Sequence, residues 1–214
     1  MRIAVTVMAA LACVANAQTS AIPAQFDTRN APVVWTADAS GAITINAGRK
    51  TNWFIAPLDL RSWDSAPMLL FRPADEFALS AKITLEPKSR WDAGSLVLFV
   101  NERTWAKLCL EAPDGPGKLT VVNVVTRGES DDGYSFPIAG NSAFMKVAKI
   151  GPSFVFYASA DGRSWQMVRN FRLDAIDDLR VGFSAQSPTG EGTKAAFSDI
   201  RYTPSRVSDM YKGE

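Results

Sequence analysis

The chain has 214 residues, with 23 lysine and arginine residues against 22 aspartate and glutamate residues, and it contains no histidine. A net charge near zero argues against nucleic acid and anionic membranes as partners, because both need a basic protein surface. Without histidine, Ser-His-Asp catalysis, Cys-His catalysis and His-ligated metal sites are excluded. Carboxylate, lysine or tyrosine chemistry and oxygen-ligated calcium stay open.

The N-terminus has the pattern of a secretory signal. Arg2 is followed by an apolar run over 4–15, and an A-x-A cleavage site ends at Ala17. The run is shorter than the roughly 20 residues that a membrane-spanning helix needs. We therefore predict a signal peptide over 1–17 and an exported chain, periplasmic or secreted, that begins at Gln18.

Cysteine content limits how the fold can be stabilised. The chain contains Cys13 and Cys109, and only Cys109 remains after cleavage. An intramolecular disulfide is then excluded, so the hydrophobic core must hold the fold. Cys13 offers a lipoprotein alternative, although Leu11 stands one place too late for a good lipobox.

The rest of the chain has the composition of short β-strands. Segments rich in Val, Ile, Phe, Thr and Trp alternate with Gly, Pro, Asp and Ser, and no long stretch has apolar residues at helical spacing. Hairpins are predicted at Pro113–Gly117 and at the Asp161-Gly162 pair, which separates two apolar runs. Strands are predicted at 42–46, 67–71, 77–85, 94–101, 104–111, 118–126, 143–150, 153–160, 164–169, 180–187 and 194–202.

Many short strands at a spacing of about 8–12 residues predict an all-β sandwich or barrel. Sheets without helices must bury their faces against each other. We predict an N-terminal segment over 18–30 and one β-domain over 31–203. Residues 204–214 are predicted to form a polar tail that frays.

The strand over 104–111 contains the clearest candidate site. Because side chains alternate along a strand, the residues at the even positions 106–110 are predicted to face the core. The opposite face carries Trp105, Lys107, Cys109 and Glu111. An exposed aromatic ring can pack on the apolar face of a sugar while charged groups bind its hydroxyls. The alternative is a solvated face with a Lys–Glu pair, which contributes about 0–1 kcal/mol.

Two further segments contain candidate ligand-binding residues. The acidic, glycine-flanked segment 127–133 is predicted to be a loop, and its oxygen-rich side chains suit calcium or closure over a ligand, although the helix-loop-helix calcium spacing is absent. An ordinary turn is the alternative. Trp53, followed by Phe54, is a second candidate for an exposed aromatic plate.

Glycoside hydrolysis needs two carboxyl groups, about 5–5.5 Å apart in retaining enzymes and about 6.5–9.5 Å apart in inverting ones. Glu129 and Asp131 begin the acidic triplet typical of a retaining glucanase on a sandwich fold, but Gly133 and Tyr134 stand where its third carboxylate belongs. The sequence therefore assigns no catalytic residue. If the chain is an enzyme, Glu111 and Asp131 are the candidate acids.

A set of weak motifs in a specific order resembles a known family. The motifs are Asp92-Ala93-Gly94-Ser95-Leu96-Val97-Leu98, Trp105-x-Lys107-x-x-x-Glu111, Val124-Val125-Thr126 with Ser130-Asp131, Ser159-x-Asp161-Gly162-x-x-Trp165-x-x-x-Arg169, and Val181-Gly182-x-x-Ala185-x-Ser187-Pro188. Together they are similar to the uncharacterised domain family that includes the regulation-of-enolase protein, within the concanavalin A-like lectin/glucanase superfamily. The resemblance covers roughly residues 30–203.

This resemblance implies a two-sheet antiparallel jelly roll with a concave groove, and no established reaction. It implies that the groove contains Trp105, Lys107, Glu111, Thr126, Ser130 and Asp131. The chain departs from the family near Trp53, where Asn52 replaces a common aspartate.

Three functions remain open from the sequence. The first is an exported carbohydrate-binding module with Trp53, Trp105, Lys107, Glu111, Thr126, Ser130 and Asp131 as ligand-binding residues and no cofactor, calcium being the open alternative. The second is a glycan-active hydrolase that uses carboxylates of the groove. The third is a structural or protein-partner-binding domain, because fold alone does not settle function.

Overall fold

A computed structural model describes residues 22, 25–32 and 34–214. The predicted signal peptide and Cys13 lie outside the described residues. Within the described part of the chain, no helix has the length and apolarity needed to span a bilayer.

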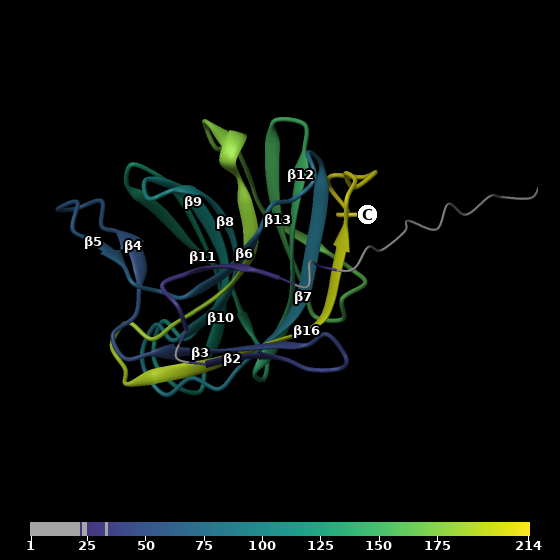
Figure 1. The fold of residues 1–214 in the computed structure, drawn as a ribbon. Helices are drawn as coiled ribbons and strands as arrows, with labels where there is room; N and C mark the ends of the chain where they lie inside the picture. The colour runs from purple at the N-terminus through teal and green to yellow at the C-terminus, as the bar shows by residue number, and fades with distance from the viewer. Residues whose placement is uncertain (1–21, 23–24, 33) are drawn as a thin grey trace, which may run out of the picture.

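Two seven-stranded antiparallel sheets pack face to face, and a short hairpin stands off the outer side of one of them (Figure 1). In spatial order, the first sheet consists of β1 (Asp27–Arg29), β6 (Met68–Phe71), β15 (Arg180–Gln186), β8 (Ala93–Asn101), β9 (Thr104–Glu111), β10 (Leu119–Arg127) and β11 (Ser130–Ile138). The second consists of β14 (Gln166–Phe171), β13 (Ser153–Ser159), β12 (Ser142–Ile150), β7 (Phe77–Leu85), β16 (Gly192–Thr203), β3 (Ile43–Gly48) and β2 (Val34–Ala37). The hairpin is β4 (Trp53–Ile55) and β5 (Ser62–Asp64).

The main hydrophobic core fills the space between the two sheets. The alternation predicted for 104–111 is confirmed, since Ala106, Leu108 and Leu110 are fully buried in this core. They face buried side chains of the second sheet such as Ile83 and Phe197. The predicted fold class is therefore confirmed: the chain is an all-β, two-sheet antiparallel jelly-roll sandwich of the concanavalin A-like kind.

Within the described residues, all eleven predicted strands are present, together with five strands that were not predicted. Four of these five, β1, β2, β4 and β5, have only three or four residues and are too short to give a readable alternation. The fifth is β11, which occupies much of the segment predicted to be a loop at 127–133. β11 is an edge strand with mostly exposed or half-buried side chains, so its composition is that of a loop.

Both predicted ends of the domain differ from the structure. β1 pairs with β6, so the sandwich includes residues before position 31. The C-terminal tail is not frayed but packs on the outer side of the second sheet. There the Tyr157 hydroxyl donates a hydrogen bond to the Met210 carbonyl at 2.7 Å, and the Lys146 ammonium donates to the Gly213 carbonyl at 2.6 Å.

The hairpin predicted at Asp161-Gly162 is confirmed between β13 and β14. One carboxylate oxygen of Asp161 accepts hydrogen bonds from the backbone N–H groups of Ser164 and Arg163, and these bonds lower the pKa of Asp161 to about 2. Gly162 has a φ of 71°, a left-handed conformation that glycine adopts without strain. A Cβ atom there would lie 2.8 Å from the ring of Phe144, so the turn has no room for a side chain.

Candidate functional site

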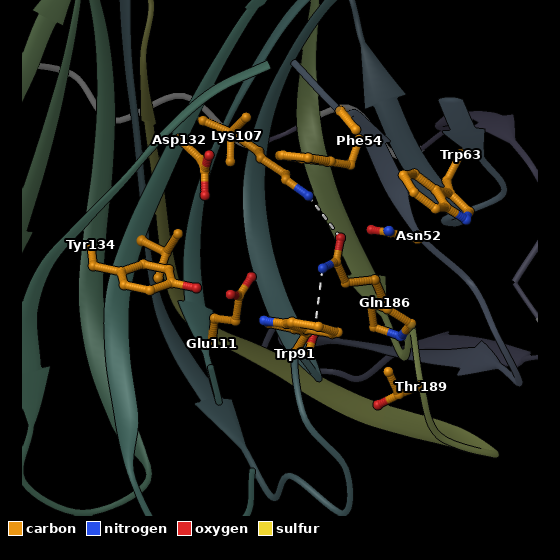
Figure 2. Close-up of a pocket in the computed structure, with 14 residues that line it drawn as sticks. Asn52, Phe54, Trp63, Trp91, Lys107, Glu111, Asp132, Tyr134, Gln186 and Thr189 are labelled. Atoms are coloured by element: carbon orange, nitrogen blue, oxygen red, sulfur yellow. Dashed lines mark hydrogen bonds between the residues drawn. The ribbon is translucent and has the colours of Figure 1, made fainter. Parts of the chain in front are cut away.

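A pocket of about 410 Å³ lies on the outer face of the first sheet, beside the β4–β5 hairpin. Its volume is within the range of about 300–1,000 Å³ that is typical of small-molecule sites. Figure 2 shows its lining side chains pointing into a common space. The pocket is lined by Asn52, Phe54, Ala56, Trp63, Trp91, Lys107, Glu111, Val122, Val124, Asp132, Tyr134, Gln186, Pro188 and Thr189.

Strand register explains why residues far apart in the sequence meet here. Asp132 of β11 pairs with Val124 of β10, which in turn pairs with Lys107 of β9. In the next row on the same face, Tyr134 pairs with Val122 and Val122 with Cys109. Alternate residues of three neighbouring strands therefore form the floor and one wall of the pocket.

The two tryptophans predicted to be exposed plates are both buried. The rings of Trp53 and Trp105 stack with centroids 4.2 Å apart, and their exposed fractions are 1% and 0%. Both belong to a second hydrophobic cluster between the hairpin and the first sheet, which also contains Met68 and Val97. The prediction of an exposed plate is wrong because the hairpin covers this end of the sheet face. The alternative, a solvent-exposed face with a Lys–Glu pair, is also wrong, because Lys107 and Glu111 are both buried.

Thr126 and Ser130 do not line the pocket either. Both are buried, and their hydroxyl oxygens lie 2.9 Å apart. The Ser130 hydroxyl oxygen also accepts a hydrogen bond from the backbone N–H of Ile55 at 2.9 Å. These two side chains therefore attach β4 to the β10–β11 turn.

Asp131 points away from the pocket, and the neighbouring acid takes its place. The Asp131 carboxylate accepts a hydrogen bond and forms an ion pair with Arg169 of β14, where the edges of the two sheets meet. Asp132 projects from the other side of β11 into the pocket (Figure 2). The predicted pair of Glu111 with Asp131 is thus corrected to Glu111 with Asp132.

Lys107 does line the pocket, and its ammonium group is held by protein acceptors. It is 3% exposed, and its Nζ donates hydrogen bonds to the Trp53 carbonyl at 2.7 Å and to the Gln186 side-chain oxygen at 2.8 Å. The lysine thereby joins the hairpin, β9 and β15 at the base of the pocket. In Figure 2 its side chain runs toward Gln186 and not toward Glu111.

Glu111 is the most perturbed carboxyl group in the pocket. It is 5% exposed, and among the described residues no hydrogen bond or ion pair reaches its carboxylate. Burial raises its pKa to about 7 despite the opposing effect of Lys107, and the negative charge of Asp132 adds to the increase. Near neutral pH the side chain is therefore a buried acid that exchanges a proton.

Trp91 forms a wall of the pocket from a strained backbone position. Its φ is 64°, a left-handed conformation that is a genuine outlier for a bulky residue. The backbone is held there because Trp91 N–H donates to the Ala112 carbonyl at 2.7 Å and the Gln186 amide donates to the Trp91 carbonyl at 3.3 Å. Such strain, of order 1–3 kcal/mol, concentrates at functional sites.

Asp92 fixes the loop that presents Trp91. It is fully buried, and one of its oxygens accepts a hydrogen bond from the Ser187 hydroxyl at 2.7 Å. The other accepts from the backbone N–H groups of Lys88 and Ser89 at 2.8 and 3.0 Å. The first motif of the family resemblance, which begins at Asp92, thus supports the pocket instead of lining it.

Aromatic side chains also form the open rim. Trp63 is 37% exposed on the hairpin, and Tyr134 is 59% exposed on β11 at the other side of the opening. Partial burial and the nearby carboxyl group of Glu111 raise the pKa of the Tyr134 phenol. The pocket therefore has aromatic surfaces at its mouth and polar groups at its base.

Of the seven predicted ligand-binding residues, Lys107 and Glu111 line the pocket. Most of the lining residues that sequence reasoning missed come from short strands or loops, whereas Asp132 and Tyr134 lie on β11 and Gln186 lies at the end of β15. Only two of the missed residues carried a usable signal. Trp91 directly precedes the Asp92 motif, and Asn52 marks the departure from the family pattern. The missed lining residues with polar or aromatic side chains are Asn52, Phe54, Trp63, Trp91, Asp132, Tyr134, Gln186 and Thr189.

The segment 127–133 forms a turn and the start of β11. In the part of the chain that the structure describes, no group of three or more Cys, Asp or Glu side chains is arranged to hold a metal ion.

Comparison with known proteins identifies the family. DUF1349, described as a protein of unknown function, matches residues 29–205. The chain belongs to this family. The Saccharomyces cerevisiae protein named Regulation of enolase protein 1 is 24% identical over 167 residues, which is 77% of this chain and 82% of that protein.

Solved structures share the DUF1349 chain's fold. A functionally unknown protein from Saccharomyces cerevisiae superposes with a TM-score of 0.77 at 22% identity, covering 86% of this chain and 98% of that one. The GH43 protein BlXynB from Bacillus licheniformis gives a TM-score of 0.62 at 19% identity. The match covers 77% of this chain but only 33% of BlXynB, so it shows a common sandwich fold within a longer protein.

Proposed function

We propose that this DUF1349 chain is a carbohydrate-binding module whose ligand occupies the pocket on the outer face of the first sheet. The observation that carries the proposal is the combination of aromatic rings at the rim with polar groups at the base. Trp63 and Tyr134 offer flat apolar surfaces for a sugar ring, and the Glu111 and Asp132 carboxyl groups can hydrogen-bond its hydroxyls. The strained wall at Trp91 also favours a binding role.

The shared fold gives weaker support. GH43 proteins, one of them described as a glycoside hydrolase, contain a sandwich similar to this one, as does the CBM2 module of a Lactobacillus casei phage protein, at a TM-score of 0.51. A shared fold does not carry function over, so the proposal rests on the pocket and its side chains.

Calorimetric titration of residues 18–214 with oligomers of glucose, xylose and N-acetylglucosamine tests the proposal. At least one series should bind, and Trp63→Ala should weaken that binding by roughly 10-fold, equivalent to about 1.4 kcal/mol. Leu58→Ala is the matched control, because Leu58 is 94% exposed on the same hairpin and does not line the pocket. No binding by any series, or an equal loss in both variants, would refute the assignment.

A second candidate, a glycan-active hydrolase, is favoured by one observation. Glu111 and Asp132 point into the same pocket, and the pKa of Glu111 is raised to about 7, the range of a general acid. Glu111→Gln separates the two candidates. A hydrolase variant would lose sugar release while keeping affinity for neutral oligomers, whereas a binding module releases no sugar from either form.

The proposal includes export of the chain. Its support is the sequence pattern of Arg2, the apolar run and the A-x-A site ending at Ala17. N-terminal sequencing of the protein recovered from the periplasm or medium should give Gln18 as the first residue. Recovery of the uncleaved chain from the cytoplasm would overturn this part of the proposal.

A further inference from the structure

The charges in the pocket are unevenly arranged. Its one lysine, Lys107, has both Trp53 and Gln186 as close acceptors, whereas the carboxylates of Glu111 and Asp132 have no hydrogen bond or ion pair with any described residue. Figure 2 shows these two carboxylates on the same side of the pocket, pointing toward each other, with the Tyr134 hydroxyl beside them. The pocket thus has an acidic side without a protein cation as its partner.

A buried carboxylate without a partner is unusual. Glu111 is 5% exposed, and charged side chains at that depth are normally paired or hydrogen-bonded. Its carboxyl group faces the pocket space, across which the Asp132 carboxylate lies. A ligand in the pocket can reach this carboxyl group, and a cationic donor matches two facing carboxylates better than a neutral hydroxyl does.

The other nearby cation does not fill this role. The Arg90 side chain donates a hydrogen bond to the Pro113 carbonyl at 2.6 Å, its guanidinium lies 4.3 Å from the centroid of the Trp91 ring, and it does not line the pocket. The aromatic rings of Trp91 and Tyr134 add a further preference, because the faces of such rings attract cations.

We propose that the pocket selects a sugar residue that carries a free amino group, with its ammonium group between the carboxylates of Glu111 and Asp132. This inference rests on the proposed carbohydrate-binding function and names its ligand class. An acidic sugar would meet the negative charge of Asp132 and would oppose ionisation of Glu111, so it is disfavoured. The N-acetylated form of the same sugar would lose the charge and present a bulkier neutral amide.

Three oligomer series of equal length and the same β-1,4 linkage provide the test: glucosamine, N-acetylglucosamine and glucose. In calorimetric titrations at about pH 6.5, where much of the ligand amine is charged, glucosamine oligomers should bind roughly 10-fold tighter than glucose oligomers. Asp132→Asn and Glu111→Gln should each remove most of this preference while keeping affinity for glucose oligomers. Asp132 is exposed, so its variant stays informative if Glu111→Gln folds poorly.

A control separates the pocket from general charge attraction. Asp114→Asn removes one exposed carboxylate that does not line the pocket, and it should keep the full preference. Equal affinity for all three series, or a preference that survives both pocket variants, would overturn the inference and leave the proposed function standing. Failure of every series to bind would instead refute the proposed function.

Discussion

The indole rings of Trp53 and Trp105 stack at an interplanar angle of 18° between the β4–β5 hairpin and the first sheet. Trp53 comes from a three-residue strand, and Trp105 comes from the middle of the sheet. Their contact joins the hairpin to the sandwich. It also divides the outer face of the sheet into a closed apolar end and an open end that contains the pocket.

Trp105→Ala should therefore reduce stability strongly. Removing a fully buried tryptophan leaves a large cavity, and such substitutions typically destabilise by about 3–5 kcal/mol. Urea denaturation of the two proteins measures the change. Trp63→Ala, at the exposed rim, is the matched control and should lower the free energy of unfolding by less than about 1 kcal/mol. Near-equal losses in the two variants would contradict the buried position of Trp105.

Strand alternation predicted which residues of 104–111 face the core, because the side-chain period of a strand is independent of its partners. It could not predict what covers the opposite face. The cover is a hairpin with three-residue strands, contributed from about 50 positions earlier in the chain. A residue such as Trp105 is exposed or buried depending on that long-range contact alone.

The choice between Asp131 and Asp132 shows a second limit of sequence reasoning. The β10–β11 turn places Val125 opposite Asp131 and Val124 opposite Asp132. A register moved by one residue would exchange the faces of these two acids, so the pairing set by the turn determines which acid faces the pocket. Two adjacent aspartates look alike in the sequence. Only the strand register shows that Asp132 faces the pocket while Asp131 pairs with Arg169.

The pKa of Glu111 predicts a pH-dependent loss of stability. Its value of about 7 in the folded chain lies above its ordinary value of 4.5, so the folded state binds the proton more tightly. The stabilising effect is complete below about pH 4.5 and is lost as pH rises through about 7. The difference corresponds to about 3 kcal/mol. Charged groups near Glu111 include Lys107 and Asp132, which act in opposite directions.

Urea denaturation of the original chain and of Glu111→Gln between about pH 4 and pH 8 isolates this effect, because other titrating groups are common to both. The variant should become the more stable protein above about pH 7. Asp132→Asn should keep a falling profile with a smaller Glu111 shift, since one cause of the raised pKa is gone. Parallel profiles for Glu111→Gln and the original chain would show that Glu111 titrates normally.

Lys107→Met should detach the hairpin from the sheet. The methionine keeps much of the apolar stem, but the Trp53 carbonyl and the Gln186 side-chain oxygen both lose a buried donor. Leaving a buried acceptor unsatisfied costs about 1–3 kcal/mol. Amide hydrogen exchange should accelerate at the β4 amide of Ile55, while amides of β12 stay protected. Unchanged exchange at Ile55 would mean that Ser130 and the Trp53–Trp105 stack hold the hairpin alone.

Deletion of residues 207–214 should destabilise the domain, although the sequence predicts that this tail frays. The deletion removes the hydrogen bonds from Tyr157 and Lys146 to the tail and uncovers the apolar cluster around Trp165. Two lost hydrogen bonds of ordinary strength contribute about 1–3 kcal/mol together. Tyr157→Phe is the matched single change, since it removes one of these bonds and keeps the ring. Tyr157→Phe should lower the thermal midpoint, but by less than the deletion does. A deletion that leaves the thermal midpoint unchanged would show that the packed tail adds nothing to stability.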